Sequence, residues 1–157
     1  QISPIMEKFD LDKMIKNVFS ELIIKAEASD IKLKSNDNTL RYVYADKNMI
    51  NQVLINLVSN AITYGKENGF VLVSIHDMNK KYLIEVKDDG IGISEDDTKR
   101  IFERFYRVEK SRNRDVGGSG VGLAIVKHII ESHNEKITVN SNETGTSFCF
   151  TLNKSIN

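Results

Sequence analysis

The stretch FVLVSIHDMNKKYLIEVKDDGIGI, residues 70–93, contains the pattern that decides the fold. Apolar and β-branched residues fill 70–78 and 81–88, and this composition and length are typical of two strands. Only Asn79 and Lys80 separate them, and a two-residue connection is typical of an antiparallel hairpin. A doubly wound parallel sheet would instead need a helical crossover between neighbouring strands. The stretch therefore predicts a sheet that contains antiparallel pairs.

The segments around this hairpin alternate between amphipathic helices and short strands. Apolar residues recur at three-and-four spacing over 11–23, behind a candidate N-cap at Asp10. A second apolar stripe runs over 50–62 and ends before Gly65. Helices and hairpins interleaved in this way predict an α/β (α+β) two-layer sandwich with a mixed, mostly antiparallel sheet. Further strands are expected at 31–35, 41–45, 136–141 and 146–152, short helical turns at 95–108, and a third long helix at 121–133.

Length and charge restrict the class of protein. The 157 residues suit one domain, and 22 basic against 22 acidic residues give a net charge of zero. Nucleic-acid binders usually carry a basic excess, so no nucleic-acid partner is expected. The single Cys149 cannot form an internal disulfide, which favours a reducing, cytoplasmic compartment. No apolar run approaches the roughly 20 residues that cross a bilayer. The chain begins at Gln1 without an initiator Met, so we expect a fragment whose parent protein could still carry a membrane anchor.

Asn56 and Asn60 are four residues apart in the second helix, so they share one face. Asn is a mediocre helix former, and two of them in mid-helix call for an explanation. A solvated helix edge is one explanation. The other is a magnesium site, because a neutral amide oxygen can supply one ligand while phosphates and water complete the shell.

A glycine-broken loop, DDGIGI at 88–93, directly follows the second strand of the hairpin. The Asp88 carboxylate could accept a hydrogen bond from the exocyclic amine of adenine, whereas guanine presents a carbonyl oxygen there. Gly90 and Gly92 allow positive φ and a close approach of the backbone to a flat base. An ordinary glycine turn after a strand is the alternative.

The segment GSGVGL, residues 118–123, leads directly into the third helix. Glycines at a helix start expose free N–H groups, and the helix dipole favours an anion there. The segment is not a P-loop, because Leu123 stands where Lys would be needed, and a polar loop rather than a strand precedes it. A flexible hinge without a ligand is the alternative.

Aromatic and basic residues gather just before the polar loop 109–118. Phe102 and Phe105 are expected to pack in the core, because aromatics at this spacing usually do. Arg104 and Arg107 are interleaved with them. Arg107 could fold onto a γ-phosphate as the loop closes.

The three histidines, His76, His128 and His133, have no second ligand at convincing metal spacing. His133 lies near the end of the third predicted helix. The helix dipole, which favours a cation at that end, adequately explains it.

The order of these elements resembles one family. The NLVSNAITYG helix (56–65), the DDGIGI loop (88–93), the FERFYRV cluster (102–108) and the GGSGVGLAIVK helix (117–127) look like the catalytic ATP-binding (HATPase, Bergerat-fold) domains of two-component sensor histidine kinases. The wider superfamily includes gyrase, mismatch-repair ATPases and heat-shock chaperones. The resemblance covers roughly residues 9–152.

This resemblance implies a sheet of about five strands covered on one face by about three helices. It makes 1–8 the remnant of a preceding dimerisation helix or linker and 9–157 the catalytic domain, with an ATP lid at about 107–118. It also implies that the parent protein is a homodimer anchored in the cell membrane, while the fragment is monomeric.

Site residues follow from the matching motif positions. Asn60 becomes the magnesium ligand with Asn56 beside it, Asp88 the reader of adenine, and Arg107 a phosphate contact. Asn56, Asn60 and Arg107 form the implied catalytic set. The other implied nucleotide contacts are Tyr64, Gly90, Gly92, Ile93, Gly118, Ser119, Gly120, Val121, Gly122, Leu123 and Thr146.

One position departs from the family pattern. Many of these kinases have Lys or Arg where this chain has Thr63, and that residue often reaches the phosphates. Lys66, three residues further on, is a candidate replacement. Weaker phosphate binding is the alternative.

The resemblance implies that the chain binds Mg-ATP and donates the γ-phosphoryl group to a histidine on a separate dimerisation domain. None of the three histidines has the acidic and Thr-Pro-like context of the family's acceptor, so the acceptor must lie outside this chain. A response-regulator receiver domain is the implied downstream partner. The rival functions are an anti-sigma serine kinase or a gyrase-like ATPase on the same fold, and a non-enzymatic nucleotide-binding module.

Overall fold

The computed structural model describes residues 3–36, 39–106 and 122–155. Within those ranges the chain forms four helices and one seven-stranded sheet. The helices are α1 (Leu11–Ala28), α2 (Lys47–Tyr64), the short α3 (Glu95–Thr98) and α4 (Gly122–Ser132). The strands are β1 (Met6–Asp10), β2 (Lys32–Ser35), β3 (Tyr42–Asp46), β4 (Phe70–Asp77), β5 (Lys81–Asp88), β6 (Ile137–Asn142) and β7 (Gly145–Lys154).

The sheet is mixed and mostly antiparallel, as the sequence predicts. Its strand order is β1-β3-β7-β5-β4-β2, and β6 pairs with β7 outside this path. Only β2 and β4 are parallel among the described pairs. The predicted hairpin is β4–β5, where the Met78 N–H donates to the Lys81 carbonyl oxygen at 2.8 Å around Asn79 and Lys80. Asn79 has a φ of 73°, which a tight hairpin turn requires.

Strand β1 is the element that the sequence does not predict. Met6–Asp10 pairs antiparallel with β3, although residues 1–8 read as the end of a linker. Within this strand only Phe9 is buried, so the segment carries almost no apolar alternation. A strand at the edge of a sheet, half paired and mostly solvated, leaves little signal of that kind.

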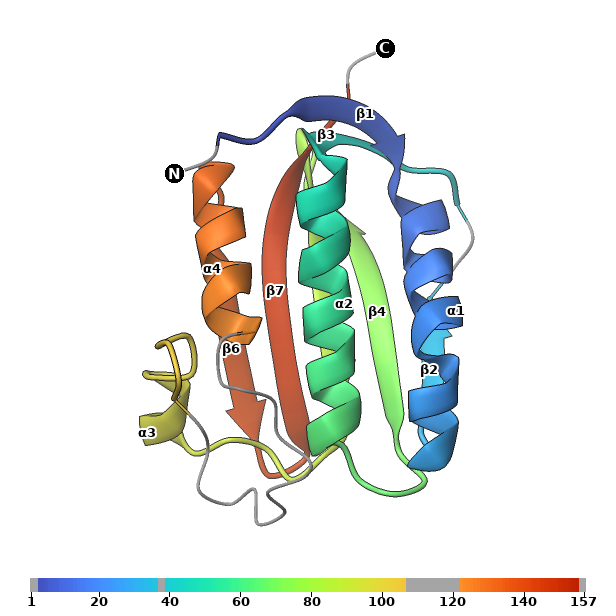
Figure 1. The fold of residues 1–157 in the computed structure, drawn as a ribbon, viewed down its shortest axis with the longest axis vertical. Helices are drawn as coiled ribbons and strands as arrows, with labels where there is room; N and C mark the ends of the chain where they lie inside the picture. Colours follow the sequence, from blue (N-terminus) through green and yellow to red (C-terminus); the bar gives the residue numbers. More distant parts are fainter. Residues whose placement is uncertain (1–2, 37–38, 107–121, 156–157) are drawn as a thin grey trace.

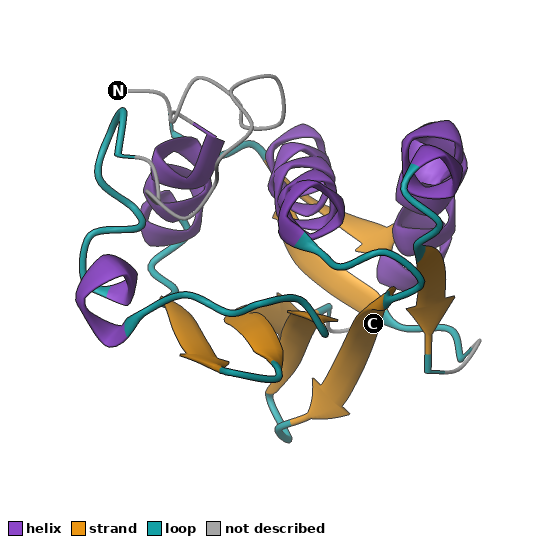
Figure 2. Cartoon of the chain, turned by 90° about the horizontal axis from the view of Figure 1, so that it is seen from below, coloured by secondary structure: helices purple, strands orange, loops and turns teal. Residues whose placement is uncertain are grey.

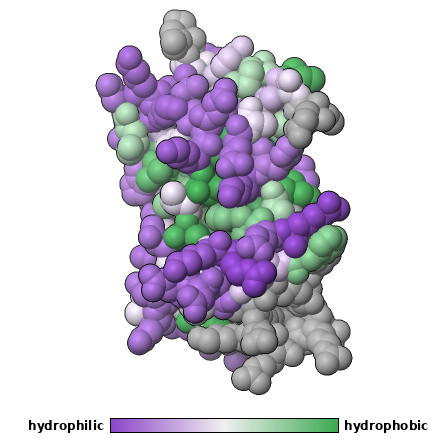
Figure 3. Space-filling view, turned by 90° about the vertical axis from the view of Figure 1, so that its left-hand side faces the viewer, coloured by the Kyte–Doolittle hydropathy of each residue, from purple (hydrophilic) through white to green (hydrophobic). Residues whose placement is uncertain are grey.

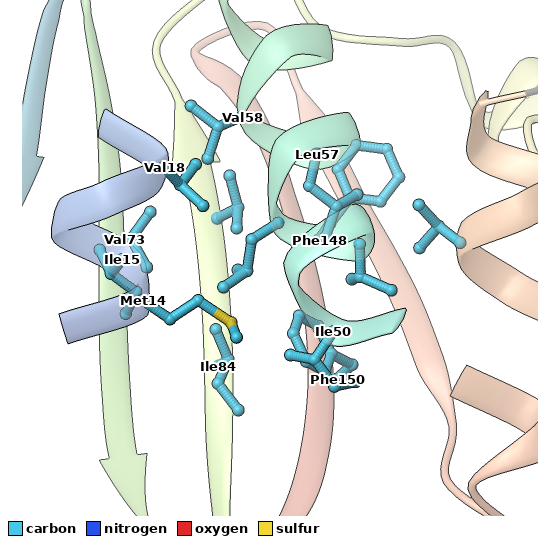
Figure 4. Packing of buried hydrophobic residues seen from close by; sticks show 14 of the residues in the cluster. Met14, Ile15, Val18, Ile50, Leu57, Val58, Val73, Ile84, Phe148 and Phe150 are labelled. Atoms are coloured by element: carbon cyan, nitrogen blue, oxygen red, sulfur yellow. The ribbon is translucent and has the colours of Figure 1, made fainter. Parts of the chain in front are cut away.

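Helices α1, α2 and α4 lie side by side on one face of the sheet (Figures 1 and 2). The core fills the space between these two layers. Figure 4 shows Met14 and Val18 of α1 and Leu57 of α2 facing Ile84 of β5 and Phe148 of β7. On the side of the molecule that carries α3 and α4, hydrophilic residues dominate and apolar ones form smaller patches between them (Figure 3). The architecture is therefore the predicted two-layer sandwich.

Capping residues fix where the two long helices begin. The Asp10 carboxylate accepts the Lys13 N–H at 3.0 Å, which confirms the predicted N-cap of α1. Asp46 does the same for α2 through the Met49 N–H at 3.0 Å. Helix α2 thus starts at Lys47, ahead of its first buried residue, Ile50.

His133 holds the end of α4 against the start of α2. It is buried, its Nε2 accepts the Asp46 N–H at 3.0 Å, and its Nδ1 lies 2.9 Å from the Ile129 carbonyl oxygen. These two contacts fit a neutral imidazole that donates from Nδ1 and accepts at Nε2. A cation favoured by the helix dipole, which the sequence suggested, would lose the bond from Asp46.

Candidate functional site

At the lower end of the molecule in Figure 1, α2 ends and β7 begins, and the loop that follows β5 contacts both. A methyl group at Gly90 would lie 2.6 Å from the Tyr64 carbonyl oxygen, so the loop after β5 packs directly on the end of α2. A methyl group at Gly145 would lie 2.0 Å from the Asp88 carbonyl oxygen, so β7 begins against the same loop. Both approaches are too close for any residue except glycine.

Asp88 ends β5 as a buried carboxylate, with 6% of its surface exposed. It pairs with Thr146 across the β5–β7 ladder, and its Oδ1 accepts the Gly90 N–H at 2.9 Å. Burial, with a smaller contribution from the nearby Asp89, raises the pKa of Asp88 to about 6, although hydrogen bonds from the Gly90 and Thr146 backbone act to lower it. At neutral pH the group is therefore a largely ionised, poorly solvated acceptor. Such a group favours a ligand that donates a hydrogen bond.

Ser141 joins the loop after β5 to the start of β7. Its hydroxyl accepts the Ile93 N–H at 2.6 Å, contacts the Thr146 hydroxyl at 2.8 Å and donates to the Gly145 carbonyl oxygen at 3.2 Å. The sequence gave no indication of this residue, because its role depends on the β6–β7 hairpin placing it beside Ile93. Its bonds hold Ile93 and Thr146, both predicted contacts, in one rigid corner.

The two glycines of the loop serve different needs. Gly92 has a φ of 83°, and a methyl group there would lie 1.9 Å from the Asn142 carbonyl oxygen. Gly90 does not have a positive φ, so that part of the sequence prediction is wrong for this residue. Gly90 is required instead for its close approach to Tyr64.

The amide face of α2 borders the same corner. The Asn56 Nδ2 donates to the Gly122 carbonyl oxygen at 3.3 Å, which joins α2 to the start of α4. Asn60 is half-buried, and within the described ranges its amide has no hydrogen-bond partner. Tyr64 lies one turn further on and is also half-buried.

The side-chain amide oxygens on this face of α2 fit a magnesium ion that is held mainly by phosphate. The described residues contain no group of three His, Cys, Asp or Glu side chains that could enclose a metal. Mg²⁺ commonly takes one or two protein oxygens and completes its octahedron with phosphates and water. The Asn60 amide, which has no hydrogen-bond partner in the described part of the chain, can provide one such oxygen without adding negative charge beside a triphosphate.

The lysine and threonine singled out by the sequence have partners of their own. The Lys66 Nζ lies 3.9 Å from the Asp89 Oδ2, and the Asp89 Oδ1 accepts the Phe70 N–H at 2.9 Å. The Thr63 hydroxyl accepts a hydrogen bond from the Lys25 Nζ of α1 at 2.8 Å. An ammonium group therefore does lie beside Thr63, and it comes from a different helix.

The aromatic cluster divides into a packed and an exposed part. Phe102 contacts Phe148 edge to face, with ring centroids 5.9 Å apart, as the prediction of core packing requires. Phe105 is 63% exposed with a φ of 67°, and the Arg104 guanidinium covers its ring at 5.0 Å. The prediction that Phe105 packs in the core is therefore wrong. Its backbone turns the side chain out of the core.

Tyr106 closes the described part of this segment. Its hydroxyl donates to the Asp97 carboxylate, and this bond raises the pKa of Tyr106. The Arg100 guanidinium lies over its ring at 4.5 Å. Five predicted contacts, together with the predicted lid at about 107–118, lie outside the described residues: Arg107, Gly118, Ser119, Gly120 and Val121. Of the glycine segment, Gly122 and Leu123 are described, and both are half-buried at the start of α4.

Comparisons with known proteins agree with this geometry. The model of the histidine kinase-, DNA gyrase B-, and HSP90-like ATPase family matches residues 45–156. Sensor-like histidine kinase SenX3 of Mycolicibacterium smegmatis is 39% identical over 149 residues, which cover 95% of this chain and 38% of SenX3. Sensor histidine kinase WalK of Bacillus subtilis is 47% identical over 115 residues, or 71% of this chain and 19% of WalK. The solved catalytic domain of histidine kinase ThkA superposes with a TM-score of 0.81 at 31% identity, covering 96% of each chain.

The chain belongs to the histidine kinase-, DNA gyrase B-, and HSP90-like ATPase family, whose members bind ATP. Within that family it is a catalytic domain of the sensor histidine kinase type, which the match to ThkA over nearly its whole length supports. The chain spans 38% of the length of SenX3 and 19% of that of WalK. No helix in the described ranges is both long and apolar enough to cross a membrane.

Proposed function

We propose that this chain binds Mg-ATP with its adenine against Asp88 and its phosphates beside Asn60. The observation that carries the proposal is a buried, largely ionised acceptor at Asp88 together with an amide at Asn60 that has no hydrogen-bond partner among the described residues. The packing of Gly90 on Tyr64 keeps the loop and the end of α2 together. A nucleotide that spans this corner would give the poorly solvated Asp88 carboxylate a further donor and the Asn60 amide a partner.

We further propose that the complete protein transfers the γ-phosphoryl group of ATP to a histidine on a separate dimerisation domain. An imidazole nitrogen of the acceptor attacks the γ-phosphorus, the bond between that phosphorus and the β–γ bridging oxygen breaks, and ADP leaves with the electron pair. The imidazole is itself the nucleophile, so this chain needs no general base. Its own contribution is positioning, which phosphoryl transfer mainly requires.

Each predicted residue has a separate task in this scheme. Asp88 fixes the base, while Asn56 and Asn60 orient the triphosphate. Asn60, with Asn56 beside it, would hold magnesium, which would neutralise phosphate charge. Arg107 would contact the γ-phosphate, and the segment 107–118 would exclude water from the reacting group.

The partners of the complete protein follow from its relatives. ThkA, 31% identical to this chain, has been solved in complex with the response regulator protein TrrA. We therefore propose that the parent of this chain passes its phosphoryl group to a response-regulator receiver domain. We also propose that the parent is a membrane-anchored homodimer with this domain in the cytoplasm, where ATP is available, since its relatives are sensor kinases.

The experiment supplies this chain with ATP and a helical domain that carries the acceptor histidine of the parent protein. Acid-labile, base-stable phosphate on that domain would support the histidine kinase assignment. Acid-stable phosphate on a serine would indicate an anti-sigma type of kinase instead. ATP turnover without any phosphoprotein would indicate a gyrase-like ATPase, and tight ATP binding with neither product would indicate a binding module.

A further inference from the structure

Lys25, in the last turn of α1, extends across to α2. Its Nζ donates to the Ser59 hydroxyl at 2.7 Å, the Thr63 hydroxyl at 2.8 Å and the Ser59 carbonyl oxygen at 3.3 Å. All three acceptors are neutral. Within the described ranges Lys25 forms no ion pair with an acidic side chain. Among the residues that the structure describes, its ammonium therefore has no acidic counter-charge.

Lys25 is an exposed residue, but partial loss of water where its side chain packs against α2 lowers the pKa of Lys25. The cause is loss of water around the ammonium group, which neutral oxygens only partly replace. An anion at this position would restore the missing counter-charge. Lys66, on the loop that follows α2, differs in this respect because it lies 3.9 Å from the Asp89 carboxylate.

The position of the ammonium relates it to the proposed phosphate site. Thr63, which it contacts, is three residues from Asn60, and residues at this spacing are neighbours on a helix surface, with Cβ atoms about 5–6 Å apart. The flexible four-carbon chain of a lysine lets its ammonium group move over that distance. Asn60 and Thr63 both lie in the last two turns of α2, at the end of the helix where the loop after β5 packs.

We propose that Lys25 is a phosphate-binding residue, whose ammonium leaves the Ser59 and Thr63 oxygens to contact the terminal phosphate of the nucleotide held at Asn60. This inference rests on the proposed binding of ATP. It assigns to α1 a direct part in selecting a triphosphate. A cation delivered from α1 also couples the packing of α1 against α2 to nucleotide binding.

The test measures the affinity of the chain for ATP and for adenosine by calorimetry, in the presence of magnesium. Lys25→Met removes the charge and keeps most of the side-chain volume. We expect it to weaken ATP binding about five-fold, as for a partly solvated ion pair, with no change for adenosine. Lys25→Arg should retain ATP affinity, and adding Thr63→Lys to Lys25→Met should restore it, because the charge returns to the same place.

Lys16→Met is the matched control, since Lys16 is exposed on the same helix and about 13 Å from Lys25 along its axis. It should leave both affinities unchanged. Equal ATP affinity in wild type and Lys25→Met, or equal weakening of ATP and adenosine, would overturn the assignment. The second result would mean that Lys25 only fastens α1 to α2.

A second measurement needs no substitution. Carbon-13 methyl groups attached to the lysines of the wild-type chain report the surroundings of each ammonium by NMR. The Lys25 signal should move with ATP and stay in place with adenosine, and a signal that ignores ATP would overturn the proposal. If wild type bound no ATP at all, the proposed function itself would fail. If ATP bound normally but the Lys25 signal did not shift, only this inference would fail.

Discussion

Replacing Asp88 with Asn should remove a pH effect on stability. Burial raises the pKa of Asp88 from 3.8 to about 6 in the fold. The fold therefore favours the protonated acid, and its stability falls as pH rises from the unfolded pKa through the folded one. Between pH 5 and pH 8 the Asp88 carboxyl should cost the wild type about 1.4 kcal/mol, because one pKa unit equals about 1.36 kcal/mol. Asp88→Asn removes this cost.

The assay is urea unfolding of both proteins at pH 5 and at pH 8. Relative to wild type, Asp88→Asn should become more stable at pH 8 than at pH 5 by the same amount, equivalent to about 3–6 °C in Tm. Subtracting the change in stability from pH 5 to pH 8 of the wild type from that of the variant gives a double difference, which removes contributions that the two proteins share. Asp46 and Glu85, whose pKa values are lowered in the fold, destabilise both proteins as pH falls. The Asn amide offers one acceptor oxygen where the carboxylate offers two, and any hydrogen bond lost for this reason is a cost that does not depend on pH.

The control is Asp96→Asn, which changes an exposed acid on α3. It should show almost no double difference. Parallel stability profiles for wild type and Asp88→Asn would refute the claim that Asp88 is a desolvated acceptor. Asp88→Asn should also lose ATP binding, although its unfolding should remain cooperative.

Three further predictions use the same corner and its supports. Adenosine affinity of the wild type should rise about ten-fold between pH 5 and pH 7.5, as Asp88 ionises with a pKa of about 6; a flat profile by calorimetry would contradict this. Gly92→Ala should lower the free energy of unfolding by about 1–3 kcal/mol and weaken ATP binding, because the φ of 83° and the contact with the Asn142 carbonyl oxygen exclude a side chain. An unchanged urea midpoint would contradict this prediction. His133→Ala should cost about 1–3 kcal/mol of stability by leaving the buried Asp46 N–H without a partner, while ATP affinity at temperatures well below unfolding stays within two-fold of wild type; loss of ATP binding in the folded variant would contradict it.

Features with strong local signals were predicted correctly from the sequence. Helix α2 and the β4–β5 hairpin follow from apolar periodicity and a two-residue turn, so neither depends on distant contacts. Asp88 could be proposed for the site because its glycine loop stands in the order of motifs that resembles the family, whereas the loop alone fits an ordinary glycine turn equally well. Its burial could not be predicted, since that depends on β7 lying alongside β5.

The failures depend on backbone geometry and tertiary contacts that local sequence patterns do not encode. Strand β1 gains its structure from pairing with β3 rather than from its own pattern. Phe105 looks like a core residue by composition, but a backbone with positive φ turns it outward. Lys25 reaches Thr63 from 38 residues away, so no local motif could associate the two. Sequence patterns thus located the motifs, whereas the contacts that couple them came only from the fold.

The central claim is that the Asp88 loop and the Asn60 face of α2 together bind one adenine nucleotide. Calorimetric titration of this chain with ATP and GTP, each with and without magnesium, tests it most directly. We expect saturable binding of one ATP, strengthened by magnesium, and no comparable binding of GTP. Equal affinity for the two nucleotides, or no binding of either, would contradict the claim.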